Sequence, residues 1–364
     1  MTTDIGSRSS SPPRGGRMSA PRPASRRRLR RAVGIAVPVV VIALTVWLVV
    51  LPQLGAATRT AESLQHLSPG LVAIAALLEA ASLASYSALT AVVLGSGRPT
   101  YFTLLRIDLA DLAVNHAVPG GGTTSGAVRM RFFRQVGIPL ADAFTTATVE
   151  ILGSNVILGV IFASGIALSL PTLVGNAYYL VAGIAVLVVL AASAVGLWAL
   201  VGRTSRTVTV VRAMARPIPK LTPVRAEAFV RTMAGRLRSF GAQPKRLAAA
   251  GTLGAANWLL DAAALGVLLA AFGHPVPVGA LATVYGLGSI LQLVPLTPGG
   301  LGLVEGVMVP AFVAFGVPAG PALLGVIGWR LLQFWAPLPI GLLAYGSLRL
   351  GPLRGAGGDR RSRR

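Results

Sequence analysis

The sequence predicts an all-α polytopic membrane protein, and three observations carry this prediction. The 364-residue chain is 54% hydrophobic and only 12% charged, and its mean hydropathy is +0.71. Several apolar segments reach the length of about 20 residues that a membrane-spanning helix needs. The basic residues gather in blocks between these segments. The segments are too long and too continuous for the alternating strands of an outer-membrane barrel.

The basic blocks set the orientation of the chain. Of the 33 Lys and Arg residues, nine precede residue 32, five lie in 98–134, eleven in 202–246 and six in 349–364. Cytoplasmic loops are enriched in Lys and Arg. The blocks therefore predict a multi-pass protein of the cytoplasmic (plasma) membrane with both termini in the cytoplasm. They also offer a surface for anionic lipids. We expect no nucleic-acid partner, because no soluble domain remains to bind one.

The chain begins with a polar tail and a first apolar helix. Residues 1–31 are rich in Ser, Pro, Gly and Arg. Such a composition buries too little apolar surface to fold, so we expect a disordered basic cytoplasmic tail. The apolar segment 32–54 follows. A signal peptide ending at Gly55–Ala57 is the alternative, but its apolar core of about 7–15 residues would be shorter. We therefore predict a retained helix.

Five further apolar segments are long enough to cross the membrane. They cover about 69–95, 140–170, 177–201, 248–272 and 319–348. The basic cytoplasmic loop 202–246 contains Arg225–Phe240, whose apolar residues have helical spacing. An amphipathic helix on the membrane surface and a solvated loop helix both fit this segment. Residues 350–364 are predicted to form a second disordered basic cytoplasmic tail.

Two stretches of the chain match each other at an offset of 179 residues. Each contains a Pro-Gly-Gly segment and, further on, a Gly-X-Pro segment. The matches align Pro119, Gly120 and Gly121 with Pro298, Gly299 and Gly300, and Gly137-Ile138-Pro139 with Gly316-Val317-Pro318. The sequence therefore predicts an internal repeat, with units 69–170 and 248–349 inside one transmembrane domain, 32–349.

The basic blocks require the two units to be inverted relative to each other. The helix at 140–170 runs from inside to outside, whereas the helix at 319–348 must end inside, because the basic tail follows it. Every block stays cytoplasmic if 101–135 and 276–314 each enter the membrane and return on the same side. We therefore predict six full transmembrane helices plus two re-entrant helical hairpins. A hydropathy plot would report this arrangement as about eight helices.

The Pro-Gly-Gly segments are predicted to form the hairpin tips and to bind substrate. Proline interrupts a helix, and irregular backbone at membrane depth is tolerated where it is buried in protein or lines a cavity. Paired broken segments in inverted repeats mark a transporter's central site, and a helix start favours an anion. Kinks in a purely structural bundle are the alternative interpretation. The candidate residues are Pro119, Gly120, Gly121, Pro298, Gly299, Gly300 and Gly302.

Two arginines near the first tip are candidates for a phosphate contact. Arg129 and Arg131 lie in "AVRMRFFR", and the planar guanidinium of arginine binds phosphate through a bidentate fork. We interpret them as ligands for the headgroup of an anionic phospholipid or a polyprenyl phosphate at the cytoplasmic mouth of a central cavity. Ordinary cytoplasmic anchoring is the alternative, and we prefer it for Arg134.

Ionisable residues inside apolar segments are costly and mark functional sites by default. The acidic ones are Glu79, Asp108, Asp111, Glu150, Asp261 and Glu305. Glu305 and Arg330 are expected to pair. Over a long stretch of the second unit, Glu305 is the only acidic residue and Arg330 is the only basic residue. Their pair would form a headgroup contact, a gate or a structural salt bridge. Glu150 and Asp261 are secondary binding candidates, and Trp258 shares a helix face with Asp261.

No pattern in the sequence points to catalysis. The chain has no cysteine, and its three histidines are His66, His116 and His274. These histidines are far apart and lack the spacing of metal ligands, and no P-loop motif is present. We therefore expect no enzyme activity, no cofactor and no metal site.

The motifs resemble those of a known family. A late motif of the form P-x-S/T-P-G-G-x-G-x-x-E, followed by an arginine, appears here as Pro295, Thr297, Pro298, Gly299, Gly300, Gly302, Glu305 and Arg330. An early Pro-Gly segment leading to Val-Arg appears as Pro119, Gly120 and Arg129. Over about 32–349 the chain resembles the transmembrane region of lysylphosphatidylglycerol synthases, a flippase-like integral membrane family.

The resemblance implies that the protein moves lipids, or lipid-linked precursors, between leaflets. Full-length synthases add a soluble aminoacyl-transferase domain, which we do not expect here because only 15 residues follow the last predicted helix. A non-transporting scaffold or accessory subunit for a separate cell-envelope lipid or glycan enzyme is the alternative. A membrane-embedded transferase acting on polyprenyl phosphates is disfavoured by the lack of a His/Asp/Glu constellation.

Overall fold

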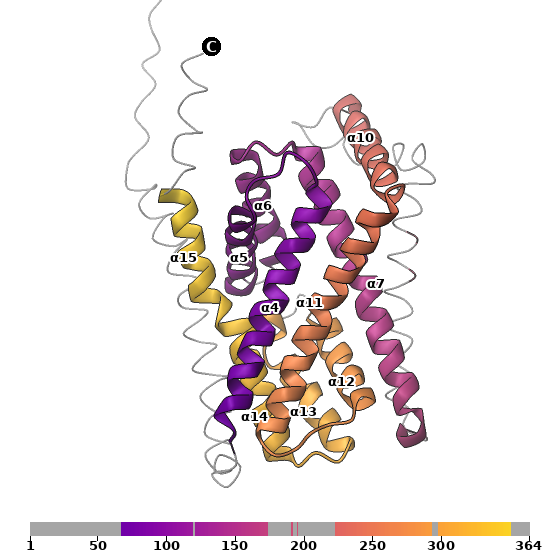
Figure 1. Cartoon of the computed structure of the whole chain (residues 1–364), viewed down its shortest axis with the longest axis vertical. Coiled ribbons are helices and arrows are strands. Elements are labelled where there is room, and N and C mark those ends of the chain that lie inside the picture. Colours follow the sequence, from indigo (N-terminus) through magenta and orange to yellow (C-terminus); the bar gives the residue numbers. More distant parts are fainter. Residues whose placement is uncertain are drawn as a thin grey trace, which may run out of the picture. The chain divides into compact units, whose positions relative to one another are not determined.

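The computed structural model describes residues 67–118, 121–173, 191, 195, 223–292 and 298–350. Over these residues the chain is all-helical, as the sequence predicts (Figure 1). Four helices are long and apolar enough to cross a membrane, and two apolar helices are shorter. The crossing predicted at 32–54, that at 177–201 apart from residues 191 and 195, the tails 1–31 and 351–364 and residues 202–222 of the basic loop lie outside the described residues.

The first half of the described chain contains two long and two short helices. They are α4 (Pro69–Leu94), α5 (Tyr101–Ala117), α6 (Gly121–Gln135) and α7 (Leu140–Leu173). The hairpin predicted at 101–135 is thus the pair α5 and α6. The Pro119-Gly120 segment between them lies outside the described residues.

The second half has a similar element order, preceded by a loop helix. Its elements are α10 (Pro223–Gly241), α11 (Pro244–Ala271), α12 (Val278–Leu291), the short helix η2 (Pro298–Gly300), α13 (Leu303–Ala314), α14 (Ala319–Arg330), the π-helical turn η3 (Leu331–Trp335) and α15 (Pro337–Leu350). The hairpin predicted at 276–314 corresponds to α12 and α13.

The single helix predicted at 319–348 is interrupted by the π-helical turn. Pro337 follows this turn and has no backbone N–H to donate, which disfavours a regular helix at this point. The backbone widens instead, and Ala336 N–H donates to the Leu331 carbonyl at 2.8 Å. The Phe334 carbonyl within the turn lies 3.1 Å from His116 Nδ1 on α5. Such turns are frequent at functional sites.

The long helices α4 and α11 pack antiparallel along their lengths. At one end, the Ser68 N–H before α4 donates to the Ala271 carbonyl at the end of α11. At the other end, Arg246 near the start of α11 donates to the carbonyls of Val92 and Val93 near the end of α4. Because each hairpin follows its long helix, α5–α6 and α12–α13 lie at opposite ends of this pair (Figure 1).

Each hairpin also packs on the last long helix of the other half. Helix α5 lies along α15, and α12 lies along α7. Glycine permits the close approach of α7 and α12, because a Cβ added at Gly165 would lie 2.5 Å from Thr283 N. Small residues of this kind let membrane helices pack closely. The two halves are therefore interlocked rather than placed side by side.

The helices α6 and α13 end in the same turn. In both, a glycine with positive φ, Gly137 at 88° and Gly316 at 90°, is followed by an apolar residue and a proline. Ile138 N–H donates to the Phe133 carbonyl at 2.9 Å, and Val317 N–H donates to the Phe312 carbonyl at 3.1 Å. This is the Schellman motif, in which glycine avoids the strain of the left-handed conformation.

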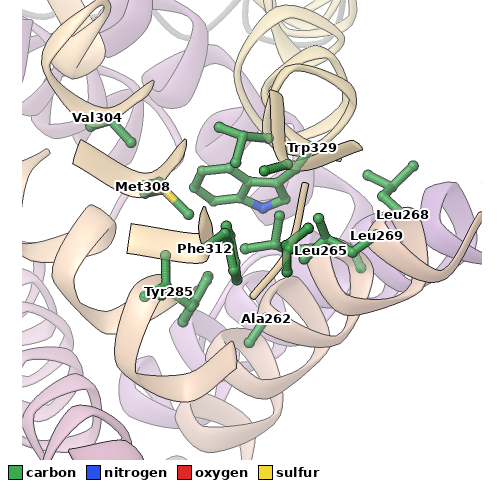
Figure 2. Close-up of a cluster of buried hydrophobic side chains, with 14 of the residues drawn as sticks. Ala262, Leu265, Leu268, Leu269, Tyr285, Val304, Met308, Phe312 and Trp329 are labelled. Atoms are coloured by element: carbon green, nitrogen blue, oxygen red, sulfur yellow. The ribbon is translucent and has the colours of Figure 1, made fainter. Parts of the chain in front are cut away.

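A large apolar cluster fills the space between α11, α12, α13 and α14. Trp329 is fully buried within it, among Leu265, Met308 and Phe312 (Figure 2). The Trp329 indole N–H points to a carboxylate, described below. Buried tryptophan usually finds such a partner, so the core also fixes a polar contact.

Helix α10 confirms the helical spacing of Arg225–Phe240 and shows what covers its apolar face. Its buried residues Val230, Ala234, Leu237 and Phe240 recur at three- and four-residue spacings, and α10 packs on α7 and α11. Arg236 also pairs with Asp142 near the start of α7. The apolar face therefore packs against the protein's own helices.

Replacing Gly165 with alanine should destabilise the protein. The added methyl group meets backbone of α12, and overpacking costs about 1–3 kcal/mol. The matched control is Gly153→Ala on the same helix, where no atom lies within 4 Å of an added Cβ; alanine there should be neutral or stabilising by up to about 1 kcal/mol. Unfolding of the purified variants in detergent measures both. Equal effects at the two positions would contradict the close α7–α12 packing.

Candidate functional site

A cavity of about 370 Å³ lies between α4, α5, α7, α11 and η3. This volume lies within the range of about 300–1,000 Å³ typical of small-molecule sites. Its lining is unusually polar for membrane helices. The carboxyl groups are those of Glu79, Asp108, Asp111, Glu150 and Asp261, and the hydroxyl and amide groups include Ser82, Tyr86, Asn115, Asn155, Asn257 and Gln333. Such groups are costly in a membrane and mark a functional site.

Arg129 of α6 joins three other helices at one end of this cavity. Its guanidinium donates to Asp108 Oδ1 on α5 at 2.9 Å and to Glu150 Oε2 on α7 at 2.5 Å. It also donates to Thr90 Oγ1 on α4 at 3.0 Å. Thr90 and Tyr86 in turn donate to Glu150 at 2.7 and 3.3 Å. The planar fork of arginine suits such bidentate contacts, so Arg129 holds the first hairpin against α4 and α7.

The charge of Arg129 is already compensated within the protein. Arg129, Asp108 and Glu150 are all buried, and the two carboxylates outnumber the guanidinium. The structure therefore places the predicted phosphate ligand Arg129 in an ion-pair network. It also brings the secondary candidate Glu150 into direct contact with it.

Arg330 of α14 forms a second buried network. Its Nε donates to Glu305 Oε1 on α13 at 2.6 Å, so the pair expected from the sequence is present. A second nitrogen donates to the Gly299 carbonyl at 2.6 Å. Glu305 also accepts the Gly302 N–H at 2.7 Å. The start of α13 therefore already has a carboxylate at its N–H groups, which is the position where an anion is favourable.

Gly299 is required by the geometry of this network. Its φ is +57°, and a Cβ added there would lie 2.0 Å from the ring of Phe334. The following Gly300 also has a positive φ, of +69°. At the tip predicted for the second hairpin, the Gly299 carbonyl thus accepts a hydrogen bond from Arg330. The same glycine packs against Phe334 of the π-helical turn.

The two networks have a common plan with the charges exchanged. In the first half, the arginine lies on the second hairpin helix and the carboxylate of Glu150 lies on the long helix that follows. In the second half, the carboxylate of Glu305 lies on the hairpin helix and Arg330 lies on the following helix. Each pair fixes a hairpin to the next long helix.

Asp261 of α11 ties a third group of helices together. It accepts the Tyr285 hydroxyl of α12 at 2.8 Å and the Trp329 indole N–H of α14 at 2.5 Å. Its carboxyl group also lies within hydrogen-bonding reach of that of Glu79 on α4. Two carboxyl groups can form such a bond only if one of them carries a proton.

The other predicted site residues are distributed as follows. Arg131 is exposed and lines a separate pocket of about 180 Å³ with Gln135, Tyr345 and Arg349. Gly121 begins α6, and Pro298 begins η2. Pro119 and Gly120 lie outside the described residues. Arg129 and Arg131, which the sequence placed at one mouth, therefore face different surroundings.

Several site residues were not singled out by the sequence as binding candidates. Tyr86 and Thr90 lie one helical turn apart on α4 and both donate to Glu150. Asn257 exchanges hydrogen bonds with Ser82 across the α4–α11 interface. The only signal for them in the sequence is a polar residue in an apolar segment, which is too common to select them.

An apolar groove of about 560 Å³ adjoins the polar cavity. Leu89, Val149, Ile157, Leu237 and Phe240 are among its lining residues. Glu150 and Ser154 belong to both linings. A polar chamber that continues into an apolar groove fits an amphiphile.

No three His, Asp or Glu side chains in the described part of the chain are grouped so as to hold a metal ion. The described carboxyl groups instead contact arginines, hydroxyls, an indole and one another. The arrangement can therefore accept hydrogen bonds from a polar group and can hold a proton.

Comparison with known proteins gives a family match and two partial relatives. The sequence model of the family described as "Lysylphosphatidylglycerol synthase TM region" matches residues 34–341. Two curated proteins of Methanothermobacter thermautotrophicus, each called "UPF0104 membrane protein", are 36% and 30% identical to the chain over 87 residues. These alignments cover 24% of the chain and 25% and 26% of the relatives. The chain thus spans about a quarter of the length of the curated relatives it matches.

Removing one partner of the Glu305–Arg330 pair should lower the free energy of unfolding more than removing both. Glu305→Gln or Arg330→Gln alone leaves a buried charge uncompensated, which costs about 3–5 kcal/mol. The double variant should recover part of this loss in the free energy of unfolding. The control is the exposed pair Glu227–Arg231, whose coupling should be about 0.3–0.5 kcal/mol. If the two double-mutant cycles gave equal coupling, the buried pair would not stabilise the hairpin as described.

Proposed function

The chain belongs to the family of the lysylphosphatidylglycerol synthase TM region, and we propose that it moves a phosphate-bearing lipid, an anionic phospholipid or a lipid-linked precursor, between membrane leaflets. The observation that carries the proposal is the polar cavity among membrane-spanning helices that shares Glu150 and Ser154 with an apolar groove. A lipid needs both surfaces at once while it crosses. The cavity would bind the polar headgroup, and the groove would bind an acyl or prenyl chain.

The cavity lining narrows the chemistry of the headgroup. Ionised carboxylates only accept hydrogen bonds, so the part of the headgroup that enters should donate them. Hydroxyl groups, as in a glycerol or sugar headgroup, meet this need. A bare phosphate among five carboxyl groups would be repelled, and Arg129 is already paired. We therefore expect the phosphate to stay outside the cavity.

Exposed arginines at the edge of the helical domain could receive the phosphate. Arg131 and Arg349 line one pocket, beside Gln135 and Tyr345. Arginine binds phosphate in a planar fork. The role proposed for Arg131 from the sequence, contact with an anionic headgroup, is kept in this form.

The translocation proposal includes an inverted repeat with two re-entrant hairpins in six full crossings. Its support is the antiparallel packing of α4 and α11, the shared turn after α6 and α13, and the hairpins at opposite ends. Inverted halves allow alternating access by rocking around a central site. With the basic blocks inside, both termini are proposed to be cytoplasmic and the membrane to be the plasma membrane.

Neither catalysis nor scaffolding accounts for the cavity as directly. A scaffold for a separate envelope enzyme needs a docking surface but no polar chamber inside the membrane. The proposal therefore assigns transport, without a cofactor, to this domain.

The re-entrant topology can be tested by single cysteines, because the chain has none. Cysteines at positions 98 and 136 should both react only from the cytoplasmic side, and cysteines at 275 and 317 only from the outside. The measurement is labelling by a membrane-impermeant thiol reagent in intact cells and in inverted vesicles. A cysteine introduced at position 59, on the predicted outer segment, is a further reference. Opposite sides within either pair would rule out a re-entrant hairpin there.

Translocation can be tested with purified protein in phosphatidylcholine vesicles containing tail-labelled phosphatidylglycerol. A membrane-impermeant reductant bleaches only outer-leaflet label, so transfer increases the bleached fraction. Arg129→Lys loses the bidentate contacts to two helices and should slow transfer about tenfold or more, since a barrier increase of about 1.4 kcal/mol already gives tenfold. The control is Arg134→Lys, at an exposed position of the same helix, which should transfer at the wild-type rate.

The outcomes of this assay separate the two leading functions. A transporter moves the labelled lipid without any other protein. A scaffold leaves the bleached fraction equal to that of protein-free vesicles, and this result with both labelled phosphatidylglycerol and a labelled lipid-linked sugar would overturn the proposal.

A further inference from the structure

Glu79 and Asp261 face each other across the interface of α4 and α11. Ser82 and Asn257 exchange hydrogen bonds at 2.8 Å across this interface. Because the helices are antiparallel, one turn back on α4 lies opposite one turn forward on α11. Glu79 is three residues before Ser82, and Asp261 is four residues after Asn257. The register therefore brings their carboxyl groups together, and both line the same cavity.

The charged and titratable groups around this pair supply no free cation among the described residues. They are Tyr285 on α12, Arg330 on α14, Asp108 and Asp111 on α5, Tyr86 on α4, Arg129 on α6 and Glu150 on α7. Arg129 and Arg330 are each held by other carboxylates. Two ionised carboxylates in contact without a counter-charge would be very costly in this setting.

The donors around Asp261 decide which residue carries the proton. Tyr285 and Trp329 both donate to Asp261, so Asp261 acts as the acceptor of the group. Glu79 must then be the donor in the bond between the two carboxyl groups. Glu79 Oε2 is buried and accepts no hydrogen bond from any N–H or hydroxyl donor within the described residues. Glu79 is therefore placed between a fixed carboxylate and the cavity.

We propose that Glu79 and Asp261 form a proton-binding site, and that exchange of its proton with the cavity supplies the driving force for lipid movement. The coupling half of this inference rests on the proposed translocation. The binding half rests only on the register of α4 and α11 and on the donors that surround Asp261. The ligand is a single proton.

Release of the proton changes the charge at a helix interface. The Glu79 O–H bond breaks, its electron pair stays on the carboxylate oxygen, and the proton passes to water in the cavity. The pair then holds two negative charges that repel each other. This repulsion acts between α4 and α11, the long helices of the two halves, and favours their separation. Binding of a proton restores the hydrogen bond and the closed interface.

Infrared spectroscopy tests the proton site without any lipid assay. In pH-difference spectra of purified protein in vesicles, the C=O stretch of a protonated carboxylic acid should be present and should disappear as the pH rises. Glu79→Gln keeps the shape and an N–H donor for Asp261, so it should fold and lack this band. Glu227→Gln, on the exposed face of α10, should keep the band. A wild-type band that persists in both Glu79→Gln and Asp261→Asn would overturn the site.

Vesicles with an imposed pH difference test the coupling. With one proton moved per lipid, each pH unit across the membrane can bias the distribution of tail-labelled phosphatidylglycerol by up to about tenfold. The bias should disappear in Glu79→Gln and persist in Glu227→Gln. A wild-type distribution that ignores the pH difference would overturn the coupling. If the wild type moves no lipid at all, the translocation proposal fails, and the infrared band still decides the proton site.

Discussion

A charge buried among membrane helices must be compensated within the protein, and the described structure is organised around two such compensations. Arg129 forms ion pairs with Asp108 and Glu150, and Arg330 forms one with Glu305. Each ion pair connects a short hairpin helix to the long helix that follows it. Because breaking a buried pair costs far more than an exposed pair contributes, these contacts fix where the hairpins end and how they face the centre.

The carboxyl groups that are not paired with Arg129 or Arg330 give the cavity its acidic character. Glu79 and Asp261, the pair proposed to share a proton, line the cavity wall together with Asp111. The chamber is consequently acidic, although the whole chain carries a net charge of +22. The basic residues gather in four blocks of the sequence outside most of the apolar segments, and the proposed topology places these blocks in the cytoplasm. Overall charge and site charge are thus opposite in sign, and the proposed function accordingly assigns phosphate recognition to the surface and hydroxyl recognition to the cavity.

Close packing makes these polar contacts possible. Glycines on α7 and α12 let the backbones approach, and Gly299 lets the tip of the second hairpin reach both Phe334 and Arg330. The exchange of partners, α5 on α15 and α12 on α7, ties each hairpin to the opposite half. A movement of α4 relative to α11 would therefore be transmitted to both hairpins, as a two-state transporter requires.

The sequence by itself determined the helical class, most boundaries of the described helices and the matching Gly-X-Pro segments that contain Gly137 and Gly316. It also determined the Glu305–Arg330 pair, because only one partner of each sign was available in that stretch. These features depend on local hydropathy, on the backbone freedom of glycine and on the number of charged residues in a segment. The tertiary structure decided the partners of Arg129, which are 21 residues away in both directions, the π-helical turn before Pro337, the apolar contacts of α10 and the facing of Glu79 and Asp261. Such contacts depend on how each helix is rotated and which helix lies opposite, and neither property is encoded in the period or hydropathy of a single segment.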